Sequence, residues 1–259
     1  PLFAHTNLKN GGFMIHEQFL RTQMLLGTEA LEKLQKARVA VFGIGGVGGY
    51  TVEALARCGI GQLDLIDSDT VSVSNINRQI LATHSTVGMP KVEALKQHLL
   101  EVNPEAQITA LNAIYCADNA ASFSLEAYDY IIDCIDSLEH KVSLILHATS
   151  LPAQFYSSMG AALKMDPTRI SVAEFWKVKG CPLAAALRRR IKKKGTFPKK
   201  KFKCVYSEEL LENRTSETEV ASGMWDAQKA QINGSLMHIT AIYGLTLAGL
   251  IIQDIANKE

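Results

Sequence analysis

The stretch Arg38–Cys58, which reads RVAVFGIGGVGGYTVEALARC, indicates the fold class of this protein. A short apolar run ends at a glycine cluster that matches G-x-G-x-x-G, with Gly43, Gly45, Gly46 and Gly48 in the glycine positions. Without side chains there, the backbone of a strand-to-helix turn can approach a phosphate closely. Asp67 ends the next apolar run, 19 residues after Gly48, where a carboxylate can accept hydrogen bonds from a ribose. This order predicts a nucleotide-binding site, and glycines that serve only helix–sheet packing are the alternative.

Short β-branched runs alternate with helical stretches on both sides of this turn. The predicted strands are Arg38–Gly43, Leu63–Asp67, Gln107–Ala113 and Tyr128–Asp133. The predicted helices are Gly46–Cys58, Pro90–Val102, Ala117–Leu125 and Ser137–Leu151. Strands that are apolar on nearly every residue suit a parallel sheet covered on both faces. We therefore expect a doubly wound α/β fold with a mostly parallel sheet and a Rossmann-like nucleotide-binding half.

The pattern is less regular after Leu151. Two further strands, Gln154–Ser158 and Ile170–Phe175, could extend the sheet. A helix over Leu183–Lys194 and a loop over Gly195–Gly223 follow, and the long helix Ala230–Ala256 ends the chain. No Pro/Ser-rich linker divides the chain, which predicts one domain with a long basic insertion. Ser235–Ile252 carries no formal charge, but its polar residues and glycines favour a helix buried in the core or in a dimer interface over a membrane span.

The net charge of +1 combines two regions of opposite sign. The segment Arg188–Lys203, RRRIKKKGTFPKKKFK, holds 10 basic residues and no acidic one. The rest of the chain has 17 basic and 26 acidic residues, a net charge of −9. A dense cationic segment on an acidic body predicts a partner that carries many negative charges.

The five cysteines are scattered, and no two are spaced as CxxC. This pattern argues against a disulfide framework and against a four-thiolate zinc site. The N-terminal sequence shows no charged region followed by an apolar one, so no secretion signal is expected. Both observations predict a cytoplasmic protein.

Three further features favour nucleotidyl transfer over a nicotinamide cofactor. The segment Asn75–Gln79, NINRQ, places amides and a guanidinium where they can hold phosphates or ribose, although a polar surface loop would read the same. Lys91 stands in the first turn of a helix, where its charge is unfavourable unless an anion lies beside it. Asp133 and Asp136 lie at the carboxyl end of the fourth strand; Asp136 is placed to hold Mg²⁺ on a triphosphate, and Asp133 is expected to be structural.

Together these motifs resemble the adenylating domain of the ubiquitin-activating-enzyme superfamily, over roughly Ile15 to Ala256. Members of that superfamily bind ATP and Mg²⁺, join AMP to a carboxylate and release pyrophosphate. The resemblance implies that the four glycines line the nucleotide turn, with Asp67 on the ribose and Asp136 on the magnesium ion. It assigns the phosphates to Asn75, Arg78, Gln79 and Lys91. It also implies a homodimer, because Arg21 in FLRTQMLLG resembles an arginine that this family inserts into the neighbouring subunit's site; an ordinary exposed arginine is the alternative.

The second half resembles one group within the superfamily. Bacterial activators of sulfur carriers usually have two CxxC pairs, whereas this chain has CPLAAALRRR, the basic run and CVYSEELL instead. This arrangement, with NGSLMHITAIYGLTLAG near the end, is similar to the tRNA threonylcarbamoyladenosine dehydratases. Those enzymes adenylate the free carboxylate of threonylcarbamoyladenosine beside the tRNA anticodon; attack from within the same group then expels AMP and closes a ring. The resemblance implies residues 14–259 as a single adenylating domain, 1–13 as an N-terminal extension or remnant, and 188–206 as a basic tRNA-contacting segment.

The basic segment fits an RNA substrate, although a solvated, mobile loop would have the same composition. Its cations could neutralise phosphates, and Phe197, Phe202 and Tyr206 could stack on unpaired bases. The predicted RNA-binding residues are Arg188, Arg189, Arg190, Lys192, Lys193, Lys194, Lys199, Lys200, Lys201 and Lys203. Ring closure needs no enzyme thiol in principle, but Cys181 and Cys204 lie on the expected substrate side and leave open a thiol relay or a sulfur-relay partner protein.

Three alternatives remain from the sequence. The first is an adenylyltransferase that activates the C-terminus of a small sulfur-carrier protein, against which the missing CxxC pairs and the basic run both count. The second is a non-catalytic RNA-binding scaffold, which Arg78, Lys91 and Asp136 oppose. The third is an NAD-dependent dehydrogenase, which the glycine turn alone would permit.

Overall fold

A computed structural model describes residues 7–10, 13–215 and 233–258, with side chains from residue 16 onward. Its main feature is a seven-stranded sheet in the order β5-β4-β3-β6-β7-β9-β8, in which all neighbours are parallel except the antiparallel edge pair β8 and β9. The strands are β3 Arg38–Phe42, β4 Gln62–Ile66, β5 Gln107–Leu111, β6 Tyr130–Asp133, β7 Gln154–Ser158, β8 Ile170–Glu174 and β9 Lys203–Ser207. The predicted doubly wound, mostly parallel α/β fold is confirmed.

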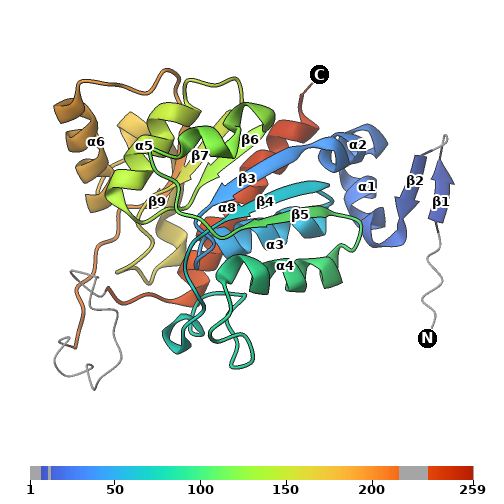
Figure 1. Cartoon of the computed structure of the whole chain (residues 1–259), viewed down its shortest axis with the longest axis horizontal. Helices are drawn as coiled ribbons and strands as arrows, with labels where there is room; N and C mark the ends of the chain where they lie inside the picture. Colours follow the sequence, from blue (N-terminus) through green and yellow to red (C-terminus); the bar gives the residue numbers. More distant parts are fainter. Residues whose placement is uncertain (1–6, 11–12, 216–232, 259) are drawn as a thin grey trace.

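Helices cover both faces of this sheet (Figure 1). They are α1 Leu20–Leu26, α2 Thr28–Lys36, α3 Gly48–Cys58, α4 Lys91–Val102, α5 Leu138–Ala148, α6 Pro182–Lys194 and α8 Met237–Ala256. Alternate residues of β3 show the division: Val39 and Val41 pack in a core with α2, α3, α4 and α8, whereas Ala40 and Phe42 pack in a second core with α5 and α6. This period-2 alternation with apolar residues on both faces is what a centrally placed parallel strand requires.

The chain reverses its direction of winding at β3. The neighbours of β3 are β4 on one side and β6 on the other, so consecutive β–α units leave it in opposite directions. Ligands of such sheets bind in the crevice beyond the carboxyl ends of the strands at this point. The predicted glycine turn therefore lies where the topology leaves a crevice.

The segment Ala117–Leu125 is not the predicted α-helix. It forms a turn and the 3₁₀ helix Ala120–Phe123, and Leu125–Ala127 forms another after it. Ser124 separates the two with a left-handed backbone (φ 44°), which an α-helix cannot contain.

The basic segment is also not the predicted loop insertion. Its first half is the end of α6, and its last residue begins β9, which pairs between β7 and β8. Four of the five residues of β9 are buried, so the alternation that would have revealed a strand is missing. The predicted Gly195–Gly223 loop therefore contains one sheet strand, and its residues 216–223 lie outside the described ones.

The last helix is shorter than predicted. It begins at Met237 rather than at Ala230, and Gly234 and Ser235 before it are not helical. Residues 230–232 lie outside the described ones. It is the one helix in the described part that is long and apolar enough to cross a membrane, with a mean hydropathy of 1.6. Its apolar composition has a packing reason, because Ile239, Tyr243 and Leu247 are fully buried on one side.

The contact between α8 and α3 is close enough to require a glycine. A Cβ atom at Gly244 would collide with the carbonyl oxygen of Val47 and lie 2.9 Å from the nitrogen of Thr51. The Thr51 hydroxyl donates a 3.2 Å hydrogen bond to the Gly244 carbonyl across the same contact. This crossing brings the start of α8 next to the glycine turn that begins α3.

An antiparallel hairpin precedes the sheet. Its strands are β1 Asn7–Asn10 and β2 Phe13–His16, with Asn7 paired to His16. The predicted boundary between residues 13 and 14 falls inside β2. The hairpin lies beside α1 and α2 at one end of the molecule (Figure 1).

Candidate active site

The glycine turn lies over the ends of three adjacent strands. The Gly43 nitrogen donates to the Ile66 carbonyl of β4, and the Cys134 nitrogen after β6 donates to the Phe42 carbonyl, both at 2.8 Å. Gly43 has a left-handed backbone (φ 87°), and a Cβ atom on it would lie 2.7 Å from the Cys134 carbonyl oxygen. The turn is therefore held from both sides of the crevice, and only glycine fits at its first position.

The other three glycines of the turn differ in what surrounds the position of a Cβ atom. A Cβ atom at Gly48 would collide with the Gly43 carbonyl oxygen, and one at Gly46 would lie 3.2 Å from the side chain of Thr240 on α8. At Gly45 the nearest atom would be Nε2 of Gln79, 3.8 Å away. The protein itself therefore requires Gly43 and Gly48 and packs Thr240 tightly over Gly46, whereas the open space above Gly45 is a cradle that a ligand can fill.

Asp67 joins this turn to the end of β4. Its Oδ2 accepts a 2.6 Å hydrogen bond from the Ile44 nitrogen, and its Oδ1 accepts a 2.9 Å bond from the Asp69 nitrogen. Burial raises the pKa of Asp67, and the charge of Lys91 opposes this rise. Each carboxylate oxygen has a second lone pair, so Asp67 can shape the turn and still accept from a ribose hydroxyl.

Lys91 has an anion beside it within the chain. Its ammonium group is buried and contacts Oδ2 of Asp69 at 2.7 Å, while the Asp69 side chain is 60% exposed. The Lys91 nitrogen also donates to the Asp69 carbonyl at 2.9 Å. The anion that the sequence demanded in the first turn of this helix is thus supplied by Asp69 and Asp67, and Asp69 is a site residue that the sequence did not indicate.

The two amides of NINRQ differ in their surroundings. Asn75 is buried, and its Oδ1 accepts from the Ser72 nitrogen at 3.1 Å, which closes the turn Val73–Asn75. Gln79 is also buried, but its Oε1 has no hydrogen-bond partner, and its Nε2 is the atom that faces Gly45. A buried acceptor without a donor costs folding free energy, so Gln79 fits a ligand with a hydrogen-bond donor over the glycine turn.

Arg78 and Asp136 are close enough for their charges to interact. Burial lowers the pKa of Arg78, and the charge of Asp136, which follows β6, opposes this. The Arg78 guanidinium donates to the Ser74 carbonyl and to Oδ1 of Asn77, both at 2.8 Å. Asp136 is exposed, and among the described residues no hydrogen bond to its carboxylate is found. A fixed arginine can bind phosphate oxygens, and an exposed carboxylate near it can hold Mg²⁺.

A buried ion pair holds the backbone that carries Asp136. Asp133 and Lys141 are fully buried with 2.8 Å between the Asp133 carboxylate and the ammonium group, and the Ser157 hydroxyl donates to the same carboxylate at 2.7 Å. The nitrogen of Ile135 donates to Asp133, and its carbonyl accepts from Lys141. Both polar groups of Ile135 are thus fixed immediately before Asp136, which is the structural role expected for Asp133.

The start of α8 closes the fourth side of the site. The Asn77 amide donates to the Ser235 carbonyl at 3.0 Å, and the Thr240 hydroxyl lies 3.4 Å from the Arg78 carbonyl. Thr240 also covers Gly46. The segment NGSLMHITAIYGLTLAG resembled the dehydratases without an assigned role, and the structure shows that its first part joins the NINRQ loop to the glycine turn.

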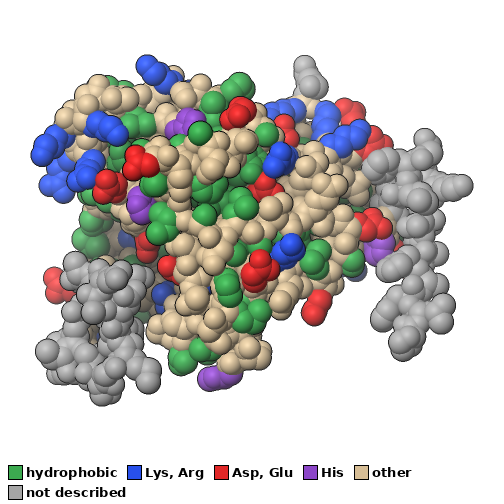
Figure 2. Space-filling model, in the orientation of Figure 1, with side chains coloured by type: hydrophobic (Ala, Val, Ile, Leu, Met, Phe, Trp, Pro, Cys, Tyr) green, Lys and Arg blue, Asp and Glu red, His purple; other side chains and the backbone are tan. Residues whose placement is uncertain are grey.

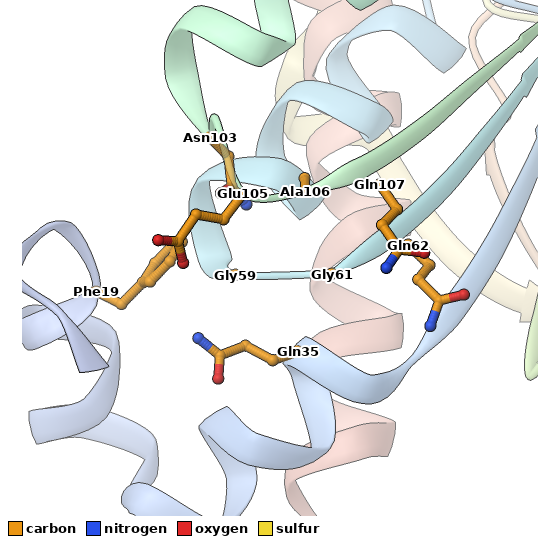
Figure 3. Close-up of a pocket in the computed structure, with 9 residues that line it drawn as sticks. All are labelled: Phe19, Gln35, Gly59, Gly61, Gln62, Asn103, Glu105, Ala106 and Gln107. Atoms are coloured by element: carbon orange, nitrogen blue, oxygen red, sulfur yellow. The ribbon is translucent and has the colours of Figure 1, made fainter. Parts of the chain in front are cut away.

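A pocket of about 230 Å³ lies elsewhere, at the amino ends of β4 and β5 (Figure 3). Side chains of Phe19, Gln35 and Glu105 converge on it, with Gly59 and Gly61 forming its floor. No residue of the glycine turn or of NINRQ lines it, so it is separate from the candidate nucleotide site.

Arg21 also lies at that end of the sheet. It is exposed on α1, and α2 leads from α1 directly into the first residue of β3. The five residues of β3, about 17 Å, therefore separate this region from the glycine turn of the same chain. Arg21 is not brought together with the other predicted site residues within one protomer.

Two of the ten predicted RNA-binding cations face inward. Arg188 donates to the Phe175 and Val178 carbonyls at 3.0 and 2.9 Å, and its guanidinium lies over the Phe175 ring. Lys200 donates to the Leu151 carbonyl at 2.7 Å and to the Ala153 carbonyl, and burial lowers its pKa. These two stabilise the fold, so their charges are not free for phosphates.

The remaining cations are on the surface. Figure 2 shows Lys and Arg side chains gathered over α6, at the end of the molecule away from the hairpin. Arg190 lies 3.9 Å from the Glu139 carboxylate in a loose ion pair. The exposed cations of the segment are Arg189, Arg190, Lys192, Lys193, Lys194, Lys199, Lys201 and Lys203.

The predicted aromatic residues of this segment divide in the same way. Phe202 and Tyr206 are 5% and 9% exposed and belong to the core under α5 and α6, so the prediction that they stack on bases is wrong. Phe197 is 49% exposed and remains available. Its neighbour is Trp176, which is 39% exposed and which the sequence did not single out.

The cysteines are poorly placed for a thiol relay. Cys181 and Cys204 are buried, and burial raises the pKa of Cys204 well above the ordinary range. Burial also raises the pKa of Cys134 to about 12. The structure thus offers neither Cys181 nor Cys204 as an accessible thiolate.

Comparison with known proteins identifies the family of this chain. The family model described as ThiF family matches residues 19–258. This chain belongs to the ThiF family. The family assignment confirms the resemblance to adenylating domains that the motifs predicted.

Among ThiF relatives, bacterial enzymes named tRNA threonylcarbamoyladenosine dehydratase match along nine-tenths or more of their length. The Bacillus subtilis enzyme is 36% identical over 93% of this chain and 95% of its own. Crystal structures of the Escherichia coli enzyme with ATP and with AMP have TM-scores of 0.80 and 0.81, are 33% identical, and cover 92% of this chain and 93% and 94% of theirs. The molybdopterin-synthase adenylyltransferase of Salmonella typhimurium is 41% identical, but over only 53% of this chain and 54% of its own.

Proposed function

We propose that this protein is an ATP-dependent tRNA threonylcarbamoyladenosine dehydratase. The observation that carries the proposal is the match with enzymes of that name over more than nine-tenths of both chains. The sulfur-carrier alternative is less supported, because its representative matches about half of the chain and the CxxC pairs are missing. The crevice supports the same reaction class, since it combines an open glycine cradle with an arginine and a carboxylate for phosphates.

The nucleotide would be held by the glycine turn and two side chains. The space above Gly45 admits the nucleotide to the backbone, and Asp67 has free lone pairs for a ribose hydroxyl. The unpartnered Oε1 of Gln79 would accept from the same ligand. Asn75 would act through the backbone, because its side chain closes the turn that carries Arg78.

Arg78 and Lys91 would supply positive charge where pyrophosphate leaves. Arg78 is already fixed by two hydrogen bonds, so little reorganisation accompanies the build-up of negative charge on the phosphates. Asp136 would hold Mg²⁺, which neutralises phosphate charge when bound; among the described residues no cluster of three or more His, Cys, Asp or Glu provides another metal site.

The reaction then needs two steps at one site. The carboxylate of the threonylcarbamoyl group attacks the α-phosphorus of ATP, and the bond to pyrophosphate breaks. A nucleophile of the same threonylcarbamoyl group attacks the activated carbonyl, AMP leaves, and a proton is released as the ring closes. The net change in the nucleoside is the loss of one water. The burial of Cys181 and Cys204 supports this direct route over a thiol relay.

Nucleoside mass provides the test. Incubation with ATP, Mg²⁺ and tRNA that carries threonylcarbamoyladenosine should remove one water from that nucleoside. Arg78→Ala should lower kcat at least about a hundredfold, because it removes charge stabilisation at the leaving group. Lys36→Ala, on the exposed side of α2, is the matched control and should leave kcat unchanged. No mass change with any nucleotide, or pyrophosphate exchange only with a small carrier protein, would overturn the proposal.

A homodimer in which Arg21 acts in the neighbouring site is also proposed. Arg21 lies at the far end of the sheet from its own glycine turn, and its helix exposes Met24 and Leu25 to 79% and 83%. Such apolar exposure on a helix with no buried residue fits a surface covered by a second copy.

Mixed dimers test the role of Arg21. Arg21→Ala and Arg78→Ala subunits should each be inactive alone. After subunit exchange, one site of each mixed dimer combines an intact Arg78 with an intact Arg21, so about a quarter of wild-type activity should return. No return of activity in dimers shown to have exchanged would mean that each site uses its own Arg21.

The other predictions from the sequence are kept as part of this proposal. They are a cytoplasmic location, a sulfur-relay partner protein, and residues 14–259 as one adenylating domain that follows an extension of residues 1–13. The family match to 19–258 supports the domain extent, while the β1–β2 hairpin crosses the suggested boundary.

A further inference from the structure

Two aromatic rings lie together on the basic surface. Trp176 belongs to the short helix Phe175–Lys177 and Phe197 to the connection between α6 and β9. They are 39% and 49% exposed, and their ring centroids are 6.2 Å apart with an angle of 38° between the planes. Single exposed apolar residues are common, but two large rings in contact on one surface patch are not explained by chance exposure.

The pair is supported from below by a row of buried rings. Phe155 contacts Phe202 at 5.0 Å, Phe202 stacks on Phe175 at 5.0 Å and 19°, and Phe175 contacts Trp176 edge-on at 5.2 Å. The row therefore runs from the core to the surface and fixes the position of the Trp176 ring. A ring held in this way loses little conformational entropy when a second flat group stacks on it.

Arg188 fixes the backbone of the same short helix. Its guanidinium donates to the carbonyl of Phe175, the first residue of the helix, and to that of Val178, which follows its last residue; it also lies over the Phe175 ring. Glu174 accepts a 3.1 Å hydrogen bond from the Trp176 nitrogen and caps the start of the helix. Backbone and ring of Trp176 are both constrained, as expected for a built surface.

Charge around the pair selects the partner. Lys177 and Lys179 follow Trp176, Lys194 and Lys199 flank the connection that carries Phe197, and all four are exposed. Aromatic rings interleaved with lysines are the composition that binds single-stranded nucleic acid, because bases stack on rings while cations neutralise the phosphates. An apolar protein partner would have to desolvate these charges without compensation.

The pair lies at the amino ends of the parallel strands, whereas the candidate active site lies beyond their carboxyl ends. Glu174, two residues before Trp176, pairs with Lys203, the first residue of β9. The five residues of β9, about 17 Å, therefore separate the level of the rings from the level of the crevice. An RNA with its reacting nucleotide at the crevice would place a nucleotide several positions away on the rings.

We infer that Trp176 and Phe197 form a stacking platform for an unpaired base of the RNA substrate. The inference rests on the proposed function for the identity of the RNA. The base is one of the unpaired bases of the anticodon loop, near the modified adenosine. Stacking requires a base that is free of its helix, so the platform distinguishes looped from fully paired RNA.

Binding of two RNAs tests the platform directly. The probes are an unmodified hairpin with the sequence of an anticodon arm and a blunt duplex of equal length, at one fixed salt concentration. Trp176→Ala/Phe197→Ala should weaken hairpin binding at least about fivefold and leave duplex binding unchanged. Met165→Ala/Val172→Ala removes two similarly exposed apolar side chains outside the platform and should change neither. Equal losses for both RNAs, or none, would overturn the inference.

Fluorescence gives a second readout that a structural role would not produce. The chain has two tryptophans, so Trp225→Phe leaves Trp176 as the single emitter. The hairpin should quench its emission and the duplex should not. Trp176→Tyr keeps a ring and should restore most hairpin affinity; failure of this rescue, with the fold intact by circular dichroism, would count against stacking.

The tRNA assay separates this inference from the proposed function. If both hold, Trp176→Ala/Phe197→Ala raises the KM for tRNA and leaves kcat unchanged. If the protein is not a dehydratase, the wild type converts no nucleoside, yet the hairpin and duplex measurements still report on the platform. If the rings contact a second copy instead, the double variant changes the oligomeric state by light scattering and leaves RNA binding unaltered, which would overturn the inference.

Discussion

The glycine turn and the basic segment carry the two halves of the proposed function, and they differ in how tightly neighbouring backbone constrains each residue. In the turn, Gly43 and Gly48 are dictated by carbonyl groups a few ångströms away. In the basic segment, ten cations share one composition, but Arg188 and Lys200 turn inward while the others face solvent. A motif that backbone geometry requires predicts the role of each of its residues. A run of charged residues predicts a charged surface but not which of its side chains face solvent.

The largest effect is expected from Gly48→Ala. Its Cβ would collide with the Gly43 carbonyl, so the turn must shift, at a cost of about 3 kcal/mol or more in the free energy of unfolding. Gly45→Ala meets no atom closer than 3.8 Å and should leave the unfolding free energy nearly unchanged while it abolishes ATP binding. Thermal unfolding and ATP titration of both variants would separate the structural role of Gly48 from the ligand-binding role of Gly45. A Gly48→Ala protein as stable as the wild type would show that backbone geometry does not dictate the turn.

The inward-facing and outward-facing cations of the basic segment should respond differently to substitution. Arg188→Ala leaves two carbonyls without their donor and should cost about 1–3 kcal/mol of stability. Arg189→Ala, its exposed neighbour, should leave stability unchanged and reduce the slope of log K against log salt for tRNA by about 1. Equal salt slopes for the two variants would show that inward and outward cations are not distinct.

Asp67 should make the stability of the turn depend on pH in the acid range. Because burial raises its pKa in the folded protein, the ionised carboxylate costs folding free energy, and this cost is relieved as pH falls through the raised value. The wild type should therefore gain stability relative to Asp67→Asn on acidification, down to the ordinary aspartate pKa of about 3.9, while ATP affinity falls as Asp67 protonates. Denaturant unfolding and ATP titration from neutral pH downward provide both measurements.

The smallest effect on activity is expected from the cysteines. Cys181→Ala and Cys204→Ala should keep kcat within about twofold, although each loses some stability from a small cavity in the core. A loss of kcat in a stably folded Cys181→Ala variant would revive the thiol relay. Reaction with iodoacetamide should reach neither thiol until the protein unfolds, since both are buried.

The sequence by itself determined the mostly parallel sheet and the glycine turn after β3, and it indicated the residues NINRQ, Lys91 and Asp136 that we propose around the nucleotide. These follow from local rules: apolar runs make strands, glycines make the turn, and strand ends of a doubly wound sheet meet at one edge. The long C-terminal helix was also evident, although it begins at Met237 rather than at the predicted Ala230.

Only the tertiary structure decided which polar and aromatic side chains are buried and which face solvent. β9 enters the sheet between β7 and β8, and this long-range pairing turns Phe202 and Tyr206 into the core. Arg188 and Lys200 find carbonyl partners in segments far along the chain, and Trp176 meets Phe197 in the same way. The direction of a side chain depends on what packs against it, and in this fold those neighbours come from segments distant in the sequence, which a local pattern does not encode.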